Sequence, residues 1–202
     1  MLFSLTLAVL VAFLAHRARL LTSGGALAAT VVGTACVLAG WRWVALLAFF
    51  FATSNLLSTW RGAEREMRSG GVIAKGGARD AAQVFANGMV FAIAAWASMY
   101  GYQAAWGAIG AGAIASATAD TWSTEVGTLV GGTPRHILTG RPVPVGTSGG
   151  VTLLGSAAAL AGAILAGVIA WSGHWGTSPV AVAVGGMAGT VTDSLLGATV
   201  QE

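Results

Sequence analysis

The segment from Gln103 to Val130, "QAAWGAIGAGAIASATADTWSTEVGTLV", decides how the whole chain must fold. It is long enough for a helix across a bilayer, which needs about 20 residues, and its first half is small and apolar. Its second half nevertheless carries Asp120 and Glu125. Carboxylates inside a membrane are costly and almost always face a bundle interior or a wet cavity. The segment therefore predicts a membrane helix that forms one wall of a polar site.

The composition of the rest of the chain agrees with a membrane setting. Of 202 residues, 55% are hydrophobic and 8% are charged, with a mean hydropathy of +0.76, whereas soluble domains carry about 25% charged residues. We expect an integral membrane protein with membrane lipids, and no nucleic acid, among its partners. The single Cys36 excludes an intrachain disulfide and a cysteine zinc site. Composition leaves the oligomeric state open.

Hydropathy divides the chain into seven apolar segments, which predict one polytopic all-α membrane domain over residues 1–202. The first resembles a signal peptide but has no basic start, and "HRARL" follows where a cleavage site should be; we expect it to be retained as a span. The seven predicted spans are Met1–Ala15, Gly24–Gly40, Trp41–Trp60, Ala81–Tyr100, Gln103–Val130, Val151–Trp171 and Pro179–Val200.

Basic residues alternate between the connections. Nine of the ten basic residues follow the first, third or fifth span: Arg17, Arg19, Arg61, Arg65, Arg68, Lys75, Arg79, Arg135 and Arg141. The exception is Arg42, which lies between the second and third spans and therefore on the other side. Because basic loops stay in the cytoplasm, the pattern predicts an outside N-terminus and a cytoplasmic C-terminus, in the plasma membrane. Aromatic residues at the opposite ends, among them Trp43 and Trp175, suit an outer aromatic belt.

The acidic residues converge on the cytoplasmic side of this bundle. Counting from the outer end, Asp120 lies roughly 25 Å and Asp193 roughly 21 Å into a core about 30 Å thick. Asp80 opens the fourth span from the cytoplasm, and Gln83 and Asn87 follow on the same helix face. These three segments and the basic loops thus bring polar groups to one level, which predicts a site facing the cytoplasm.

Carboxylates and hydroxyls without many His or Cys suit a hard divalent ion, most simply Mg²⁺. We expect Asp120, Glu125 and Asp193 to be catalytic and to bind this metal. However, Asp120 and Glu125 are about 140° apart on a regular helix. Either the helix is distorted there, or the two acids serve different ligands.

Two loops supply cations and glycines for the phosphates of a ligand. In the first, Lys75 and Arg79 flank Gly76 and Gly77 directly before a helix, where backbone N–H groups favour anions. The second loop contributes two arginines and a hydroxyl-glycine cluster: Arg135, Arg141, Thr147, Ser148, Gly149 and Gly150. Acids for a metal and cations for phosphate at a lipid boundary suggest a nucleotide-dependent reaction on a phosphorylated lipid.

Four ordered blocks resemble a known family: "KGGARDAAQVFANG", "ATADTWSTEVG", "VPVGTSGGVTLLG" and "DSLLGATVQ". They are similar to the hallmark blocks of the transmembrane protein nineteen family, also called domain-of-unknown-function family ninety-two, which includes plant phytyl-phosphate kinase. The resemblance implies a membrane kinase that transfers phosphate from CTP, or another nucleoside triphosphate, to an isoprenyl monophosphate. It also implies a further span after "GATVQ", so the chain is expected to lack a C-terminal family span.

On this resemblance, the site includes residues from all four blocks: Lys75, Arg79, Asp80, Gln83, Asn87, Asp120, Thr121, Ser123, Glu125, Thr147, Ser148, Gly149, Gly150, Asp193 and Gln201. We expect Lys75, Arg79, Arg135 and Arg141 to contact phosphates. Asp80 is expected to be a fourth catalytic acid, as a metal ligand or as the partner that orients Arg79, with capping of its helix as the alternative role.

Two other functions use the same parts. A CTP-dependent cytidylyltransferase acting on a lipid phosphate needs the same metal and phosphate contacts. A transporter or flippase of a phosphorylated lipid also has intramembrane acids, but its site favours the midplane. The predicted polar groups gather near one face, which favours the enzymes.

Overall fold

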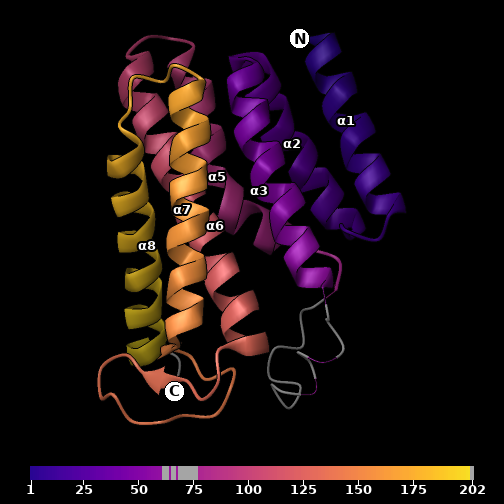
Figure 1. The fold of residues 1–202 in the computed structure, drawn as a ribbon. Helices are drawn as coiled ribbons and strands as arrows, with labels where there is room; N and C mark the ends of the chain where they lie inside the picture. The colour runs from indigo at the N-terminus through magenta and orange to yellow at the C-terminus, as the bar shows by residue number, and fades with distance from the viewer. Residues whose placement is uncertain (61–63, 65–66, 68–76, 201–202) are drawn as a thin grey trace.

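In the part of the chain that the structure describes, seven helices run alternately up and down in a single bundle (Figure 1). The computed structural model describes residues 1–60, 64, 67 and 77–200. Within them the helices are α1 (Leu2–Arg17), α2 (Ser23–Ala39), α3 (Trp41–Thr59), α5 (Ala81–Ser98), α6 (Gln103–Val130), α7 (Leu153–Ser172) and α8 (Pro179–Val200). Each predicted span matches one of these helices to within two residues at either end. The all-helical prediction is thus confirmed for the described part of the chain.

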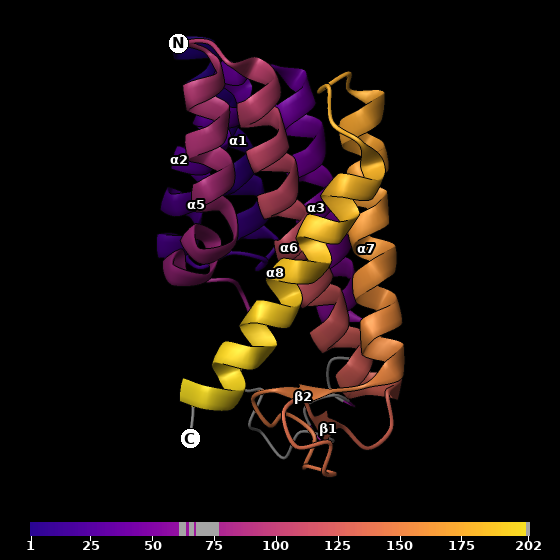
Figure 2. The same ribbon diagram turned by 90° about the vertical axis from the view of Figure 1, so that its left-hand side faces the viewer.

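A short strand pair interrupts the helical pattern between α6 and α7. Strands β1 (Arg135–His136) and β2 (Gly150–Val151) pair antiparallel, with Arg135 opposite Val151 and His136 opposite Gly150. Figure 2 shows them below the bundle, at the same end as the C-terminus. The sequence did not predict this pair, because two-residue strands leave no hydropathy period. It closes the loop that carries Thr147 and Ser148.

Three of the described helices, α5, α7 and α8, are both long and apolar enough to cross a membrane. Helices α1 and α2 are apolar but shorter. Polar side chains lower the hydropathy of α3 and α6, which contain Asn55 and Asp120 respectively. In a membrane protein such side chains are expected to face the bundle interior rather than lipid.

Helix α6 lies at the centre of the bundle and packs against α3, α5, α7 and α8 (Figures 1 and 2). Its approach to α7 is close because both helices present glycine. A Cβ on Gly155 would lie 2.9 Å from the Ser123 carbonyl oxygen and 3.2 Å from the Gly127 Cα. Small residues let membrane helices pack backbone to backbone, where the hydrophobic effect gives little drive. This packing holds the polar half of α6 against α7.

An aromatic cluster fills the end of the bundle opposite the strand pair. The Trp43 ring lies 5.1 Å from the Phe91 ring and 4.4 Å from the Trp175 ring, centroid to centroid. Trp43 and Trp175 are buried, so their predicted place in an outer aromatic belt was wrong. Buried aromatic pairs stabilise by their large contact area and preferred ring geometry. Trp41, Tyr100, Tyr102 and Trp171 are exposed, as that belt requires.

Candidate functional site

Two pockets meet at Asp120, at the end of the bundle where α6 finishes and α5 and α7 begin. The first, about 230 Å³, is called here the acidic pocket and is lined by Asp120, Ser123, Thr124, Thr128, the loop 145–150, Thr152, Asp193 and Ser194. The second, about 270 Å³, is called the arginine pocket and is lined by Arg19, Asn55, Ser58, Thr59, Arg79, Gln83, Asn87, Asp120, Thr121, Thr124 and Glu125. Both pockets include Asp120 and Thr124.

The two acids of α6 face different pockets. Helix α6 runs as one α-helix from Gln103 to Val130, so it keeps Asp120 and Glu125 about 140° apart. Asp120 lines both pockets, whereas Glu125 lines the arginine pocket. The spacing of Asp120 and Glu125 allowed either a distorted helix or two acids with different surroundings. The structure favours the second alternative.

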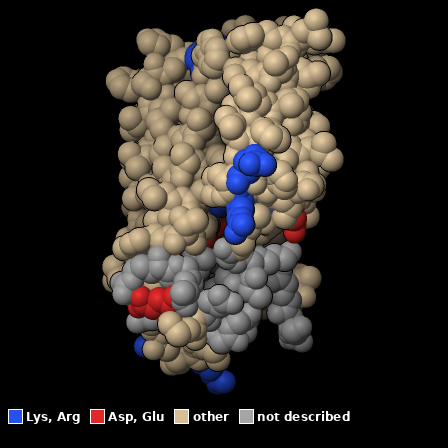
Figure 3. All heavy atoms as spheres, turned by 90° about the vertical axis from the view of Figure 1, so that its right-hand side faces the viewer, with Lys and Arg blue, Asp and Glu red and all other residues tan. Residues whose placement is uncertain are grey.

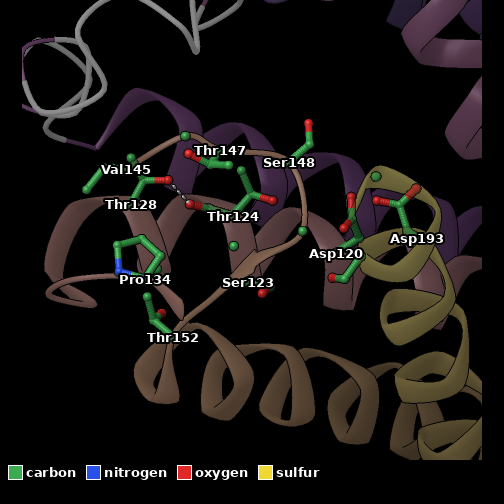
Figure 4. A pocket seen from close by; sticks show the side chains of 16 residues that line it. Asp120, Ser123, Thr124, Thr128, Pro134, Val145, Thr147, Ser148, Thr152 and Asp193 are labelled. Atoms are coloured by element: carbon green, nitrogen blue, oxygen red, sulfur yellow. Dashed lines mark hydrogen bonds between the residues drawn. The ribbon is translucent and has the colours of Figure 1, made fainter. Parts of the chain in front are cut away.

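The acidic pocket brings together carboxylates from two helices. Figure 4 shows Asp120 on α6 and Asp193 on α8 beside each other in the same space. Asp193 is exposed and Asp120 is half-buried. Two carboxylates this close repel each other unless a cation or a proton offsets their charge. The same pocket is lined by the hydroxyls of Ser123, Thr124 and Ser194, so the available ligand atoms are mostly oxygen.

The loop between β1 and β2 covers the acidic pocket and is held against α8. The Thr147 hydroxyl donates to the Pro144 carbonyl oxygen (2.8 Å), and the Gly150 N–H donates to the Thr147 carbonyl oxygen (3.0 Å). Gly149 adopts a positive φ of +73°, and a Cβ there would lie 2.9 Å from the Ala198 Cα. The loop backbone thus touches α8 where a side chain would not fit.

A side chain at Gly149 is therefore expected to destabilise the fold for two reasons. An L-residue at positive φ costs about 1–2 kcal/mol, and the clash with Ala198 adds the cost of overpacking, about 1–3 kcal/mol. We expect Gly149→Ala to lower the free energy of unfolding by more than Gly132→Ala. Gly132 has a matching φ of +75° but no atom within 4 Å of its Cβ position. Thermal unfolding in detergent measures both; equal losses would show that contact with α8 contributes nothing.

The arginine pocket is built around the residue that precedes α5. The Arg79 N–H donates to the Leu20 carbonyl oxygen (2.9 Å), and the Thr22 N–H donates to the Arg79 carbonyl oxygen (3.0 Å). These bonds fix the Arg79 backbone to the turn between α1 and α2. Its side chain reaches α3, where Nη2 donates to the Ser58 hydroxyl (3.5 Å). The Ser58 hydroxyl in turn donates to Glu125 Oε1 (2.6 Å), which links α3 to α6.

Arg79 has further capacity to bind an anion. Its Nη1 is buried and makes no hydrogen bond to any residue that the structure describes. Burial lowers the pKa of the Arg79 guanidinium from its ordinary value, yet arginine stays charged in proteins. A buried donor without a partner costs about 1–3 kcal/mol, and more when charged. An anionic oxygen in the arginine pocket would relieve that cost.

Asp80 lies outside both pockets and caps α5. Its carboxylate accepts the Gln83 N–H (2.9 Å), while the Gln83 side-chain oxygen accepts the Asp80 N–H (3.1 Å). This is a capping box. Of the roles predicted for Asp80, the structure shows the cap. Gln83 also belongs to this cap, although it lines the arginine pocket.

The cap makes a prediction about stability. Asp and Asn are about equally good N-caps, whereas Ala in their place costs about 1 kcal/mol. We expect Asp80→Ala to lower the free energy of unfolding by about that amount, and Asp80→Asn, which keeps the cap, to lower it by less. Thermal unfolding of the purified variants checks this. A loss in Asp80→Asn equal to that in Asp80→Ala would mean that the charge matters more than the cap.

The other predicted residues divide between the pockets, the surface and the undescribed part of the chain. Thr147, Ser148, Gly149 and Gly150 line the acidic pocket, and Asn87 and Thr121 line the arginine pocket. Arg135 and Arg141 are exposed and line neither; Arg135 Nη1 instead donates to the Gly140 carbonyl oxygen (2.9 Å). Lys75 and Gln201 lie outside the described residues.

The structure does not bring the three predicted metal ligands to one point. Asp120 and Asp193 share the acidic pocket, but Glu125 lines the arginine pocket with Arg79. Among the described residues, no group of three or more His, Cys, Asp or Glu side chains is placed to hold one ion. Mg²⁺ is often held by one or two carboxylates plus waters and phosphate, so the pair of aspartates still fits such an ion.

Sequence reasoning missed the contribution of α3 and of the turn between α1 and α2. Arg19, Asn55, Ser58 and Thr59 all line the arginine pocket. A signal was present in "TSNLLS", Thr53 to Ser58, where Asn55 and Ser58 are three positions apart and share a face of an otherwise apolar helix. Arg19 was interpreted as a topology signal alone.

Comparison with known proteins identifies the family but adds no solved structure, since none matches the chain. Protein PGR of Arabidopsis thaliana is 32% identical, over the whole of this chain and 79% of that protein. An uncharacterized membrane protein of Methanocaldococcus jannaschii is 30% identical, over 96% of this chain and 81% of that protein. The family model described as "Integral membrane protein DUF92" matches residues 6–202. The chain therefore belongs to the DUF92 family of integral membrane proteins.

Proposed function

We propose that this protein is a membrane-embedded kinase that transfers the terminal phosphoryl group of a nucleoside triphosphate, CTP by family resemblance, to an isoprenyl monophosphate. One observation carries the proposal: Asp120 lines both an acidic, hydroxyl-rich pocket and a pocket centred on Arg79. Two neighbouring polar pockets with a common wall suit a reaction between two phosphate groups. Phytyl or another prenyl phosphate would be the acceptor.

In this reaction an oxygen of the acceptor phosphate bonds to the γ-phosphorus, the bond from that phosphorus to the β-phosphate oxygen breaks, and CDP leaves. The acceptor is already anionic near neutral pH, so it needs no strong general base. Catalysis then consists of positioning and of offsetting charge. Arg79 suits the acceptor phosphate, while the loop Thr147–Gly150, which lines the acidic pocket, would lie against the nucleotide phosphates.

The acidic pocket fits the expected Mg²⁺ ion. Asp120 and Asp193 offer carboxylate oxygens beside several hydroxyls, which are the hard ligands that this ion prefers. Bound there, Mg²⁺ would offset the charge of the nucleotide phosphates.

We further propose that the site faces the cytoplasm, in the plasma membrane. The described arginines at the end of the bundle that carries the pockets are Arg17, Arg19, Arg79, Arg135 and Arg141, and only Arg42 lies at the other described end. Basic residues favour the cytoplasmic side. CTP and free Mg²⁺ would be available on that side.

The direct test uses purified protein with Mg²⁺, farnesyl monophosphate and CTP labelled at either the α- or the γ-phosphate. Transfer of the γ-label to the lipid, with release of CDP, is the result expected. Transfer of the α-label with release of pyrophosphate would instead indicate a cytidylyltransferase. If neither label reaches the lipid, and vesicles containing the protein accumulate farnesyl monophosphate, the protein is a transporter and the kinase proposal fails.

A further inference from the structure

An apolar groove lies beside the arginine pocket, between α1, α2, α3 and α5. Its volume is about 430 Å³, and nearly all of its lining is hydrophobic. On α3 the lining runs from Trp41 to Ala52, which at 1.5 Å per residue corresponds to about 16 Å along the bundle. The groove is therefore long and narrow enough for a single hydrocarbon chain.

The groove ends at the polar site. Arg79, Gln83 and Asn87 line its polar end, and the same three residues line the arginine pocket. An amphiphile that filled both spaces would place its tail among apolar side chains and its head beside a guanidinium. Gln83 is already engaged in the α5 cap, so Arg79 is the principal donor for that head.

The hydrogen-bonding state of Arg79 indicates what the head should be. Its buried Nη1 has no partner among the described residues, while Nη2 is bonded to Ser58. Guanidinium groups bind phosphate through two parallel hydrogen bonds. A phosphate at this point would satisfy the buried nitrogen and complement the charge of Arg79. A phosphomonoester carries about −1.5 to −2 charge near neutral pH, more than the phosphodiester of a bulk lipid, so it would fit Arg79 better.

The outer surface around α1 is suited to the approach of a lipid. Figure 3 shows this face as largely uncharged apart from a small group of basic side chains. Arg17 and Arg19, at the end of α1, are exposed. Basic residues at a membrane boundary attract anionic lipid heads.

We propose that the groove between α1, α2, α3 and α5 holds the tail of a single-chain lipid phosphate, with its phosphate on Arg79 in the arginine pocket. This rests on the proposed function in taking that lipid to be the acceptor. It assigns the acceptor to the arginine pocket and leaves the acidic pocket to the nucleotide, with Asp120 between them. Because a tail gains little by leaving bilayer lipid, selection depends on the phosphate and on the shape of the groove.

The test locates the tail directly. Farnesyl monophosphate with a diazirine at the end of its tail is irradiated with the full-length protein in membranes without nucleotide, and labelled peptides are mapped. We expect labels on α1, α2 and α3, suppressed at least tenfold by excess unmodified farnesyl monophosphate. Inorganic phosphate should suppress them far less. Labels that farnesyl monophosphate does not displace would show a groove filled by bulk lipid, and labels confined to α7 or α8 would also overturn the proposal.

A matched pair of variants on α3 tests the groove itself. Ala48 is exposed and lines the groove, whereas Ala45 is exposed and does not line it. We expect Ala48→Trp to fill the space and lower labelling at least fivefold, and Ala45→Trp to leave it unchanged. Equal labelling of the two variants, both shown by size-exclusion chromatography to be folded, would overturn the proposal.

Turnover separates this inference from the kinase proposal. If farnesyl monophosphate displaces the labels from the groove but no phosphoryl transfer is found, the lipid site is supported and the kinase proposal fails. If Ala48→Trp does not affect phosphoryl transfer and the labels lie outside the groove, the kinase proposal stands and the groove proposal fails.

Discussion

Asp120→Asn is expected to reduce prenyl diphosphate formation by about a hundred- to a thousandfold, the effect typical of removing one electrostatic contact at a reacting group. Of the two residues that line both pockets, Asp120 and Thr124, only Asp120 is charged, so its carboxylate is placed to act on both partners of the proposed transfer. Asn keeps the shape of the side chain but removes its charge. The rate of γ-label transfer from CTP to farnesyl monophosphate, measured at saturating substrates, checks this.

The matched control is Asp80→Asn, which makes the same chemical change outside both pockets. Asn can cap α5 as Asp80 does, so this variant is expected to keep near wild-type turnover. Size-exclusion profiles and thermal unfolding should show that both variants fold. If Asp120→Asn retains wild-type turnover, Asp120 has no part in the reaction; if Asp80→Asn loses as much as Asp120→Asn, the effect is not specific to the pockets.

The helices were predictable because hydropathy is a local property of the sequence. Apolar runs separated by glycine, arginine and proline marked every described helix to within two residues. The burial of Trp43 and Trp175 was not predictable in this way. Aromatic residues near span ends suit both a membrane interface and a core, and only the tertiary contact with Phe91 distinguishes the two.

The level of the candidate site was also predictable, but its division into two pockets was only partly so. Depth follows from counting residues along a helix, which placed Asp120 and Asp193 at one end. The 140° between Asp120 and Glu125 already conflicted with a single metal site. Which neighbour each acid meets depends on how α3 and α8 pack against α6, and no local pattern encodes that packing. The polar face formed by Asn55 and Ser58 is visible in the sequence, but the hydrogen bond from Ser58 to Glu125 is seen only in the structure.

The exposed loop arginines show a further limit of the sequence. Arg135 and Arg141 were expected on phosphates because they neighbour Thr147 to Gly150 in the chain. The β1–β2 pair folds this loop so that its hydroxyls and glycines line the acidic pocket while both arginines remain exposed. Proximity in sequence does not determine which side of a loop faces a pocket.

The assignment of one substrate to each pocket makes the second large prediction. Arg79→Ala is expected to raise KM for farnesyl monophosphate at least tenfold, because a charge-assisted contact to phosphate is worth about 1.5–3 kcal/mol. It should also lower kcat. KM for CTP should stay within about twofold of wild type. The fold should survive, since the bonds that tie this residue to Leu20 and Thr22 come from its backbone. Arg79→Lys should restore only part of the loss, because Lys lacks the planar fork.

Asp193→Asn should show the opposite pattern. Asp193 is exposed and lines the acidic pocket but not the arginine pocket. Its substitution is therefore expected to raise KM for CTP and the Mg²⁺ concentration needed for half-maximal rate. KM for farnesyl monophosphate should change little. Steady-state kinetics with each substrate varied in turn separate these effects. If the substitutions at Arg79 and Asp193 raise both KM values together, the two pockets act as one site. If each raises the KM expected of the other, the substrates bind in reverse, and the tail cannot lie in the groove that ends at Arg79.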